Sequence, residues 1–146
     1  MKKKPIEILP LQGLPELKFG EDIAQAEFVF GKPEETEEFD DEEFEFQTIV
    51  YYYWDLGLSL FFKKAKKPVL IAIETDDLKA TLLDKKVFQM NEKALIEFFA
   101  TQKMYDYEAE VEDWGERRLT WEAWNIDFYF EGKEMTTINW SAGAEQ

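Results

Sequence analysis

The chain of 146 residues contains no cysteine and no histidine. The lack of cysteine excludes disulfides, thiolate nucleophiles and thiolate-bound zinc or iron–sulfur centres. The lack of histidine excludes Ser-His-Asp and Cys-His catalysis, imidazole proton shuttles and nearly all zinc or copper sites. Serine occurs only at Ser59 and Ser141. We therefore expect a protein that is not an enzyme and that holds neither a metal nor a cofactor.

Basic residues are in the minority: 17 Lys and Arg stand against 32 Asp and Glu, a formal net charge of −15 at pH 7. This charge repels phosphate backbones and anionic lipid surfaces, so we expect no nucleic-acid binding and no membrane binding. It attracts a basic protein partner, chiefly by speeding association. The simpler interpretation is that the acidity keeps the protein soluble.

Long apolar runs are missing, although hydrophobic residues make up 45% of the chain and aromatic residues 16%. No segment approaches the roughly 20 apolar residues of a membrane-spanning helix. Residues 2–4 are lysines, as at the start of a signal peptide, but Pro5, Glu7 and Pro10 interrupt the stretch that follows. We expect one folded domain over residues 1–146, cytoplasmic if residue 1 is the natural start.

Two segments carry helix signals. Residues 22–30 begin with a favourable N-cap, Asp22, and are followed by Gly31, which suits a helix C-terminus. Residues 91–102 begin with Asn91 and place their apolar residues on one face. The sequence therefore predicts a helix in each segment.

Seven segments are rich in β-branched and aromatic residues or alternate in polarity, and are predicted strands: 46–54, 58–62, 69–74, 105–112, 117–122, 126–131 and 135–140. Short linkers join the first three into an antiparallel meander. Alternation in 105–112 predicts a half-buried strand with Tyr105 and Tyr107 inward.

The remaining segments are expected to be irregular. Residues 1–19 are predicted to be an extended arm, and residues 78–90 a loop that ends in a short strand. Residues 34–45 hold nine acidic residues. Such a run suits Ca²⁺ binding or mimicry of nucleic-acid charge, but it lacks the spacing of an EF-hand loop, so a solvated loop is favoured.

The sequence contains a faint internal duplication. Residues 51–62 align with 119–130, and Gly57 then meets Asn125, another residue type that tolerates positive φ. This predicts an α+β fold of two pseudo-repeats, about 20–88 and 89–141. Each repeat would be one helix plus a three- to four-stranded antiparallel meander, with the sheets joined or packed and the helices on one side. The alternative is a chance alignment.

This arrangement resembles the β-lactamase-inhibitor-protein fold, in which two tandem helix-plus-sheet repeats form a concave aromatic surface. The FVFGKP segment at 28–33 is similar to the helix-then-GxP segment that opens the repeat in outer-membrane assembly lipoproteins of related fold. The hairpin at 54–62 is similar to one in small bacterial proteins and implies no activity. The resemblance implies a shape and a binding role. No functional residue is carried over, because the inhibitors have disulfides and the lipoproteins a lipidated cysteine.

The aromatic residues give the strongest functional indication. Both faces of the strand at 46–54 are apolar or aromatic, so either both are buried or one meets a partner. Tryptophan and tyrosine are favoured at interface hot spots. The candidate partner-binding residues are Tyr51, Tyr53, Trp114, Trp121, Trp124 and Tyr129.

These observations favour a non-catalytic protein-binding module, of inhibitor or immunity type, with an aromatic sheet face and an acidity that steers a basic partner. The alternative is a small-ligand or peptide-binding domain with a pocket between sheet and helix. An enzyme, which would need carboxylates converging in a cleft, is the third hypothesis. A homodimer also stays open.

Overall fold

The computed structural model describes residues 4–40 and 47–143. Within these ranges eight strands form one antiparallel sheet, the main sheet, in the order β2-β3-β4-β5-β11-β10-β9-β8. Its strands are β2 (Glu35–Asp40), β3 (Gln47–Tyr53), β4 (Leu58–Lys63), β5 (Val69–Thr75), β8 (Glu108–Val111), β9 (Arg117–Trp121), β10 (Ile126–Glu131) and β11 (Glu134–Ser141). A small second sheet contains β1 (Glu7–Ile8), β6 (Thr81–Leu82) and β7 (Lys85–Lys86).

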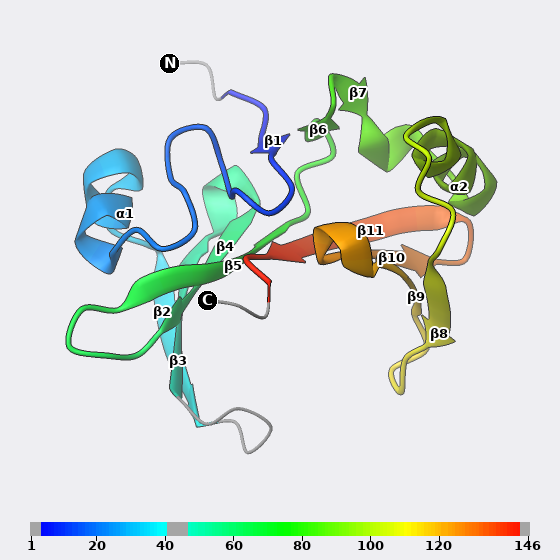
Figure 1. Cartoon of the computed structure of the whole chain (residues 1–146). Helices are drawn as coiled ribbons and strands as arrows, with labels where there is room; N and C mark the ends of the chain where they lie inside the picture. The colour runs from blue at the N-terminus through cyan, green and yellow to red at the C-terminus, as the bar shows by residue number, and fades with distance from the viewer. Residues whose placement is uncertain (1–3, 41–46, 144–146) are drawn as a thin grey trace.

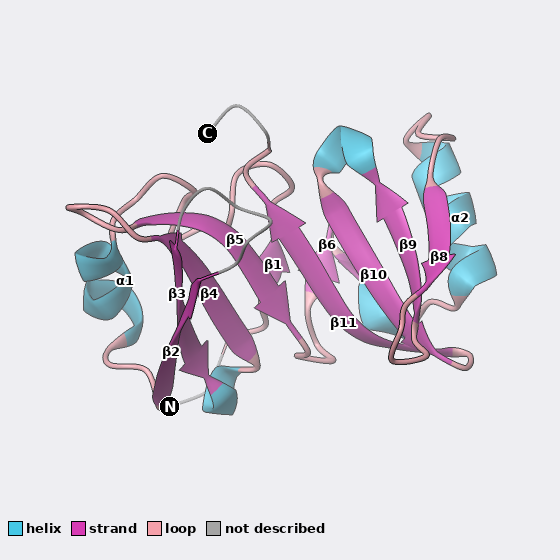
Figure 2. Cartoon of the chain, turned by 90° about the horizontal axis from the view of Figure 1, so that it is seen from below, coloured by secondary structure: helices cyan, strands magenta, loops and turns pink. Residues whose placement is uncertain are grey.

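Both helices begin where the sequence predicts. The side chain of Asp22 accepts a hydrogen bond from the Gln25 amide before α1 (Ile23–Phe30), and that of Asn91 accepts one from the Ala94 amide before α2 (Glu92–Thr101). Both helices lie on the same face of the main sheet, together with residues 4–20 and the second sheet (Figure 1). We call this the inner face. Figure 2 looks onto the opposite, outer face.

The two halves of the main sheet meet where β5 pairs with β11, with Ile73 opposite Trp140. In each half a 3-10 turn links two strands: η1 (Trp54–Leu56) leads to β4 and η3 (Glu122–Trp124) leads to β10. Gly57 and Asn125 end these turns in the left-handed conformation, which confirms that they serve the same kind of turn. A Cβ at Gly57 would lie 2.8 Å from an Asp76 carboxylate oxygen and 3.1 Å from the Asp77 backbone nitrogen, so a larger residue would crowd the following loop.

The predicted α+β fold of two helix-plus-meander repeats is wrong. Of the described residues, 44% lie in strands and 20% in helices, and one large sheet runs through the whole molecule. The edges of β5 and β11 satisfy each other's backbone hydrogen bonds, so the chain builds one continuous sheet. The segments at 4–20 and 76–90 also supply buried residues, such as Leu14 and Val87, to the core shared by the two halves.

The acidic run is not simply a solvated loop, because Glu35–Asp40 forms the edge strand β2, paired in register with β3. All six of its residues are exposed, so their charges stay hydrated, as is usual on edge strands. Residues 41–45 of the run, and Phe46 of the predicted strand at 46–54, lie outside the described residues.

Three further segments differ from expectation. The strand predicted at 105–112 is the short edge strand β8, and the residues predicted to point inward are exposed, Tyr105 at 69% and Tyr107 at 41%. In 78–90 the strands β6 and β7 come first and the segment ends in the turn η2 (Val87–Gln89). Residues 4–19 lie on the inner face, where Ile8 and Leu17 are buried.

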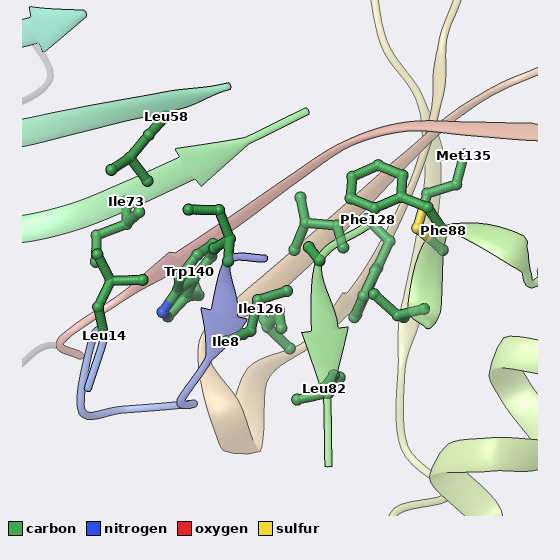
Figure 3. Packing of buried hydrophobic residues seen from close by; sticks show 14 of the residues in the cluster. Ile8, Leu14, Leu58, Ile73, Leu82, Phe88, Ile126, Phe128, Met135 and Trp140 are labelled. Atoms are coloured by element: carbon green, nitrogen blue, oxygen red, sulfur yellow. The ribbon is translucent and has the colours of Figure 1, made fainter. Parts of the chain in front are cut away.

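The core lies between the inner face and the elements that cover it. Figure 3 shows Trp140 beside Leu14 and Ile8, with Ile126 and Leu82 close by. The Trp140 indole N–H donates to the Gly13 carbonyl at 3.1 Å, which anchors the N-terminal segment to the sheet. No helix in the described part of the chain is long and apolar enough to cross a membrane.

Candidate binding face

Side chains alternate between the two faces of every strand. Because most of the apolar side chains point to the inner face, the outer face is left with mainly polar and aromatic ones. The apolar residues opposite it, such as Leu60 and Phe128, are buried on the inner face. One row of outer-face residues runs directly across neighbouring strands of the main sheet: Tyr52, Ser59, Glu74, Asn139, Asp127 and Thr120. Neither α1 nor α2 lies on this face (Figure 2), although Ser59 and Thr120 of the row are buried, at 8% and 9% exposure.

Tyr52 and Trp54 form a stacked ring pair at one end of this row, with centroids 4.4 Å apart and planes 12° from parallel. The acidic edge strand holds this Tyr52–Trp54 stack in place: the Tyr52 hydroxyl donates to Glu37 at 2.6 Å, and the Trp54 indole N–H donates to Glu35 at 3.3 Å. Trp54 is nevertheless 56% exposed. The stack is thus a fixed aromatic surface that water still reaches.

A small pocket of about 70 Å³, the Glu74 pocket, opens beside the stack. Its lining residues are Trp54, Gly57, Leu58, Ser59, Glu74, Thr75, Asp76 and Thr137. Burial raises the pKa of Glu74 above its ordinary value, the charges of Asp76 and Glu116 raise it further, and a hydrogen bond with Asn139 opposes the shift. The pocket therefore holds a carboxylate whose described charged neighbours are also acidic.

The other half of the outer face carries an arginine surrounded by acids, the Arg118 cluster. The Arg118 guanidinium pairs with Glu110 at 2.7 Å and with Glu112 at 2.5 Å, and lies 3.8 Å from Asp127. It also donates to the Thr120 hydroxyl, which in turn donates to Asp127. Burial raises the pKa of Asp127, while the bond from Thr120 and the charge of Arg118 lower it. This cluster supplies its own cation.

A second aromatic pair lies next to the Arg118 cluster. The rings of Trp114 and Tyr129 have centroids 6.3 Å apart, and the Trp114 indole N–H donates to Glu116 at 2.8 Å. Trp114 is 65% exposed, and burial of Tyr129 raises its pKa to about 12. The outer face therefore presents an exposed tryptophan in each half.

The sequence-predicted binding residues divide between the two faces. Trp114 and Tyr129 lie together on the outer face. The other four point to the inner side. Tyr53 and Trp121 are buried in the core, at 2% and 0% exposure. The Tyr51 hydroxyl donates to Glu27 of α1 at 2.6 Å, and Trp124 packs against a core phenylalanine.

The residues missed by sequence reasoning are Tyr52, Trp54, Glu74 and Asp127. The pattern of 46–54 separates Tyr52 and Trp54 from Tyr51 and Tyr53, but it cannot tell which set faces the helices, because both sets are aromatic. Glu74 does carry a signal: it is the one charged residue of the otherwise apolar segment VLIAIE.

Among the described residues no group of three or more acidic side chains is placed to hold a metal ion. Comparisons with protein-family models, with curated proteins and with solved structures found no match for this chain. The resemblance to the β-lactamase-inhibitor-protein fold therefore stays a prediction.

Proposed function

We propose that this protein is a non-catalytic protein-binding module, of inhibitor or immunity type, that docks a basic protein on the outer face of its main sheet. The observation that supports this most is the pair of exposed tryptophans, Trp54 and Trp114, which pack beside outer-face tyrosines and donate hydrogen bonds to carboxylates. Exposed tryptophan costs solubility, and in interfaces it is among the residues that contribute most to binding free energy.

Rigidity favours the same function. The outer face is backed by a core that includes fully buried rings, among them Trp140 and Phe128. Hydrogen bonds that the Tyr52 hydroxyl and the Trp54 indole N–H donate to the β2 carboxylates fix the Tyr52–Trp54 stack before any partner arrives. A surface that is already ordered loses little conformational entropy on binding, so more of the contact energy becomes affinity.

The charge selects the partner. Both edge strands of the main sheet are acidic, with Glu35 and Glu37 on β2 and Glu108 and Glu110 on β8. Together with the net charge of −15 they attract a cationic protein and speed its association, and they repel nucleic acid. A chain without cysteine also suits a reducing cytoplasm, where we place this activity.

Affinity capture from the source cells tests the proposal. The probes are the wild-type chain, the double variant Trp54→Ala/Trp114→Ala and the control variant Phe28→Ala, whose ring is 84% exposed on α1. We expect a stoichiometric basic partner that the control retains and that the double variant loses at least tenfold. Capture should weaken as salt rises from 50 to 500 mM. No stoichiometric partner, or loss with Phe28→Ala alone, would overturn the proposal.

The two other hypotheses gain less support. The space between the sheet and α2 is filled by stacked rings, with Phe99 and Trp121 centroids 4.0 Å apart, which leaves no argument for a ligand there. Two outer-face carboxylates, Glu74 and Asp127, do have raised pKa values. They do not converge on one pocket, because Asn139 stands between them and Asp127 is held by the Arg118 cluster.

A further inference from the structure

We propose that the Glu74 pocket receives an arginine side chain of the partner, with its guanidinium stacked on Trp54 and paired with the Glu74 carboxylate. The inference rests on the proposed function and adds the chemistry of one contact. The pocket is far smaller than the roughly 300–1,000 Å³ of pockets that hold small-molecule ligands. At about 70 Å³ it suits a single planar head group.

The charges around the pocket are unbalanced. None of the ion pairs formed by the described residues involves Glu35, Glu37, Glu74 or Asp76. In the other half of the same face, Arg118 neutralises Glu112 and its neighbours. The Arg118 cluster thus contains its own cation, whereas the carboxylates around the Glu74 pocket take part in none of these ion pairs and can meet a cation from outside.

The aromatic wall favours arginine over lysine. Tryptophan gives the strongest cation–π contact of the aromatic side chains. Tyr52 covers one face of the Trp54 ring, and the 56% exposure of Trp54 shows that the ring remains accessible from elsewhere. A planar guanidinium can stack on a ring and present two N–H groups to a carboxylate at once, which a lysine ammonium cannot do.

Burial of Glu74 makes the contact dependent on pH. Its pKa is raised chiefly because the carboxylate lies largely out of water, and further by the charges of Asp76 and Glu116, while a hydrogen bond with Asn139 opposes the shift. A guanidinium pairs with the ionised carboxylate only, so binding should strengthen as pH rises through the pKa of Glu74. The bound guanidinium should in turn stabilise the ionised form of Glu74. A merely structural Glu74 would leave binding insensitive to this titration.

The probe is the peptide acetyl-Gly-Arg-Gly-amide, with a citrulline peptide as its neutral isostere. The readout is the set of five indole N–H signals in a ¹⁵N correlation spectrum, with that of Trp54 assigned by Trp54→Phe. We expect the arginine peptide to shift the Trp54 signal saturably, with the citrulline peptide at least tenfold weaker. Glu74→Gln should weaken binding at least fivefold, and Phe28→Ala, at a ring that is 84% exposed on α1, should leave it unchanged.

Three outcomes would overturn the arginine pocket: equal binding of the citrulline peptide, no response of the Trp54 signal, or full affinity in Glu74→Gln. Capture of the partner separates this failure from failure of the proposed function. If capture is lost with Trp114→Ala but kept with Trp54→Ala and Glu74→Gln, the proposed binding face stands and the arginine pocket is refuted. Absence of any stoichiometric partner removes the proposed function itself.

Discussion

Replacing Arg118 by methionine should destabilise the protein strongly, because it leaves a cluster of carboxylates without their cation. The Arg118 side chain is 18% exposed and contacts Glu112 and Asp127, whose side chains are 21% and 29% exposed. Methionine keeps much of the apolar length of the side chain, so the change removes mainly the charge and its hydrogen bonds.

The magnitude follows from the exposure of the partners. A solvent-exposed ion pair contributes about 0–1 kcal/mol, whereas removing one partner of a buried pair costs about 3–5 kcal/mol. The Arg118 cluster lies between these limits, because its third carboxylate, Glu110, is 62% exposed while the other two are largely buried. We therefore expect a loss of about 2–3 kcal/mol in the free energy of unfolding at pH 7.

The loss should depend on pH in a definite direction. The charge of Arg118 lowers the pKa of Asp127, so in Arg118→Met that pKa rises further above its unfolded value. A carboxyl group with a raised pKa in the folded state favours folding below the unfolded pKa, and this contribution is lost as pH rises through the folded pKa. The deficit should thus be largest near neutral pH and smaller at about pH 3.5, close to the unfolded pKa of Asp.

Urea denaturation followed by tryptophan fluorescence measures both effects. The matched control is Arg117→Met on the same strand, because Arg117 is 46% exposed and, among the residues that the structure describes, forms an ion pair only with Glu92. The control should lose no more than about 1 kcal/mol. The reasoning fails if the two variants lose the same stability at pH 7, or if the deficit of Arg118→Met grows as the solution is acidified.

Other substitutions test the core, the turns and the tyrosines. Phe99→Ala, at a fully buried ring, should lose about 3–5 kcal/mol in urea denaturation, and Phe28→Ala less than about 0.5 kcal/mol; equal losses would contradict the packing. Gly57→Ala should lose at least about 1–2 kcal/mol in thermal melts, because φ is positive there, whereas Asn125→Gly should change stability by less than about 0.5 kcal/mol. Burial raises the pKa of Tyr53 to about 12, above an unfolded value near 10. The stability that the neutral Tyr53 hydroxyl contributes to the folded state is therefore present below about pH 10 and is lost as pH rises through about 12. The melting temperature should fall between about pH 10 and 12, and Tyr53→Phe should reduce this fall. A melting temperature that does not change with pH over this interval would contradict the role given to Tyr53.

Local signals in the sequence predict local structure well. Asp22 and Asn91 mark both helix starts, because an N-cap side chain bonds to an amide only three residues away. Gly57 and Asn125 mark two equivalent turns, because few residue types accept a left-handed backbone. In each case the cause and its effect lie within one turn of chain, so no knowledge of the rest of the fold is needed.

The pairing of β5 with β11 could not be predicted in this way. It joins Thr75 to Ile138, and no pattern near either residue specifies the other. The same limit applies to the binding face, since Tyr51 and Tyr52 differ only in which side of β3 receives α1. Sequence reasoning found an aromatic strand but could not tell which of its faces would be covered.

The acidic edges of the main sheet bear on what can bind there. An edge strand offers unpaired backbone groups to any other strand, including the same strand of a second copy. Two β2 strands side by side would bring Glu35, Glu37 and Glu38 of one copy against the same residues of the other, and like charges across a strand pair are destabilising. The charge therefore opposes a homodimer joined through β2 while it favours a cationic partner. The same acidic strand that would repel a second copy of itself also holds the Tyr52–Trp54 stack in the position where a guanidinium would meet it.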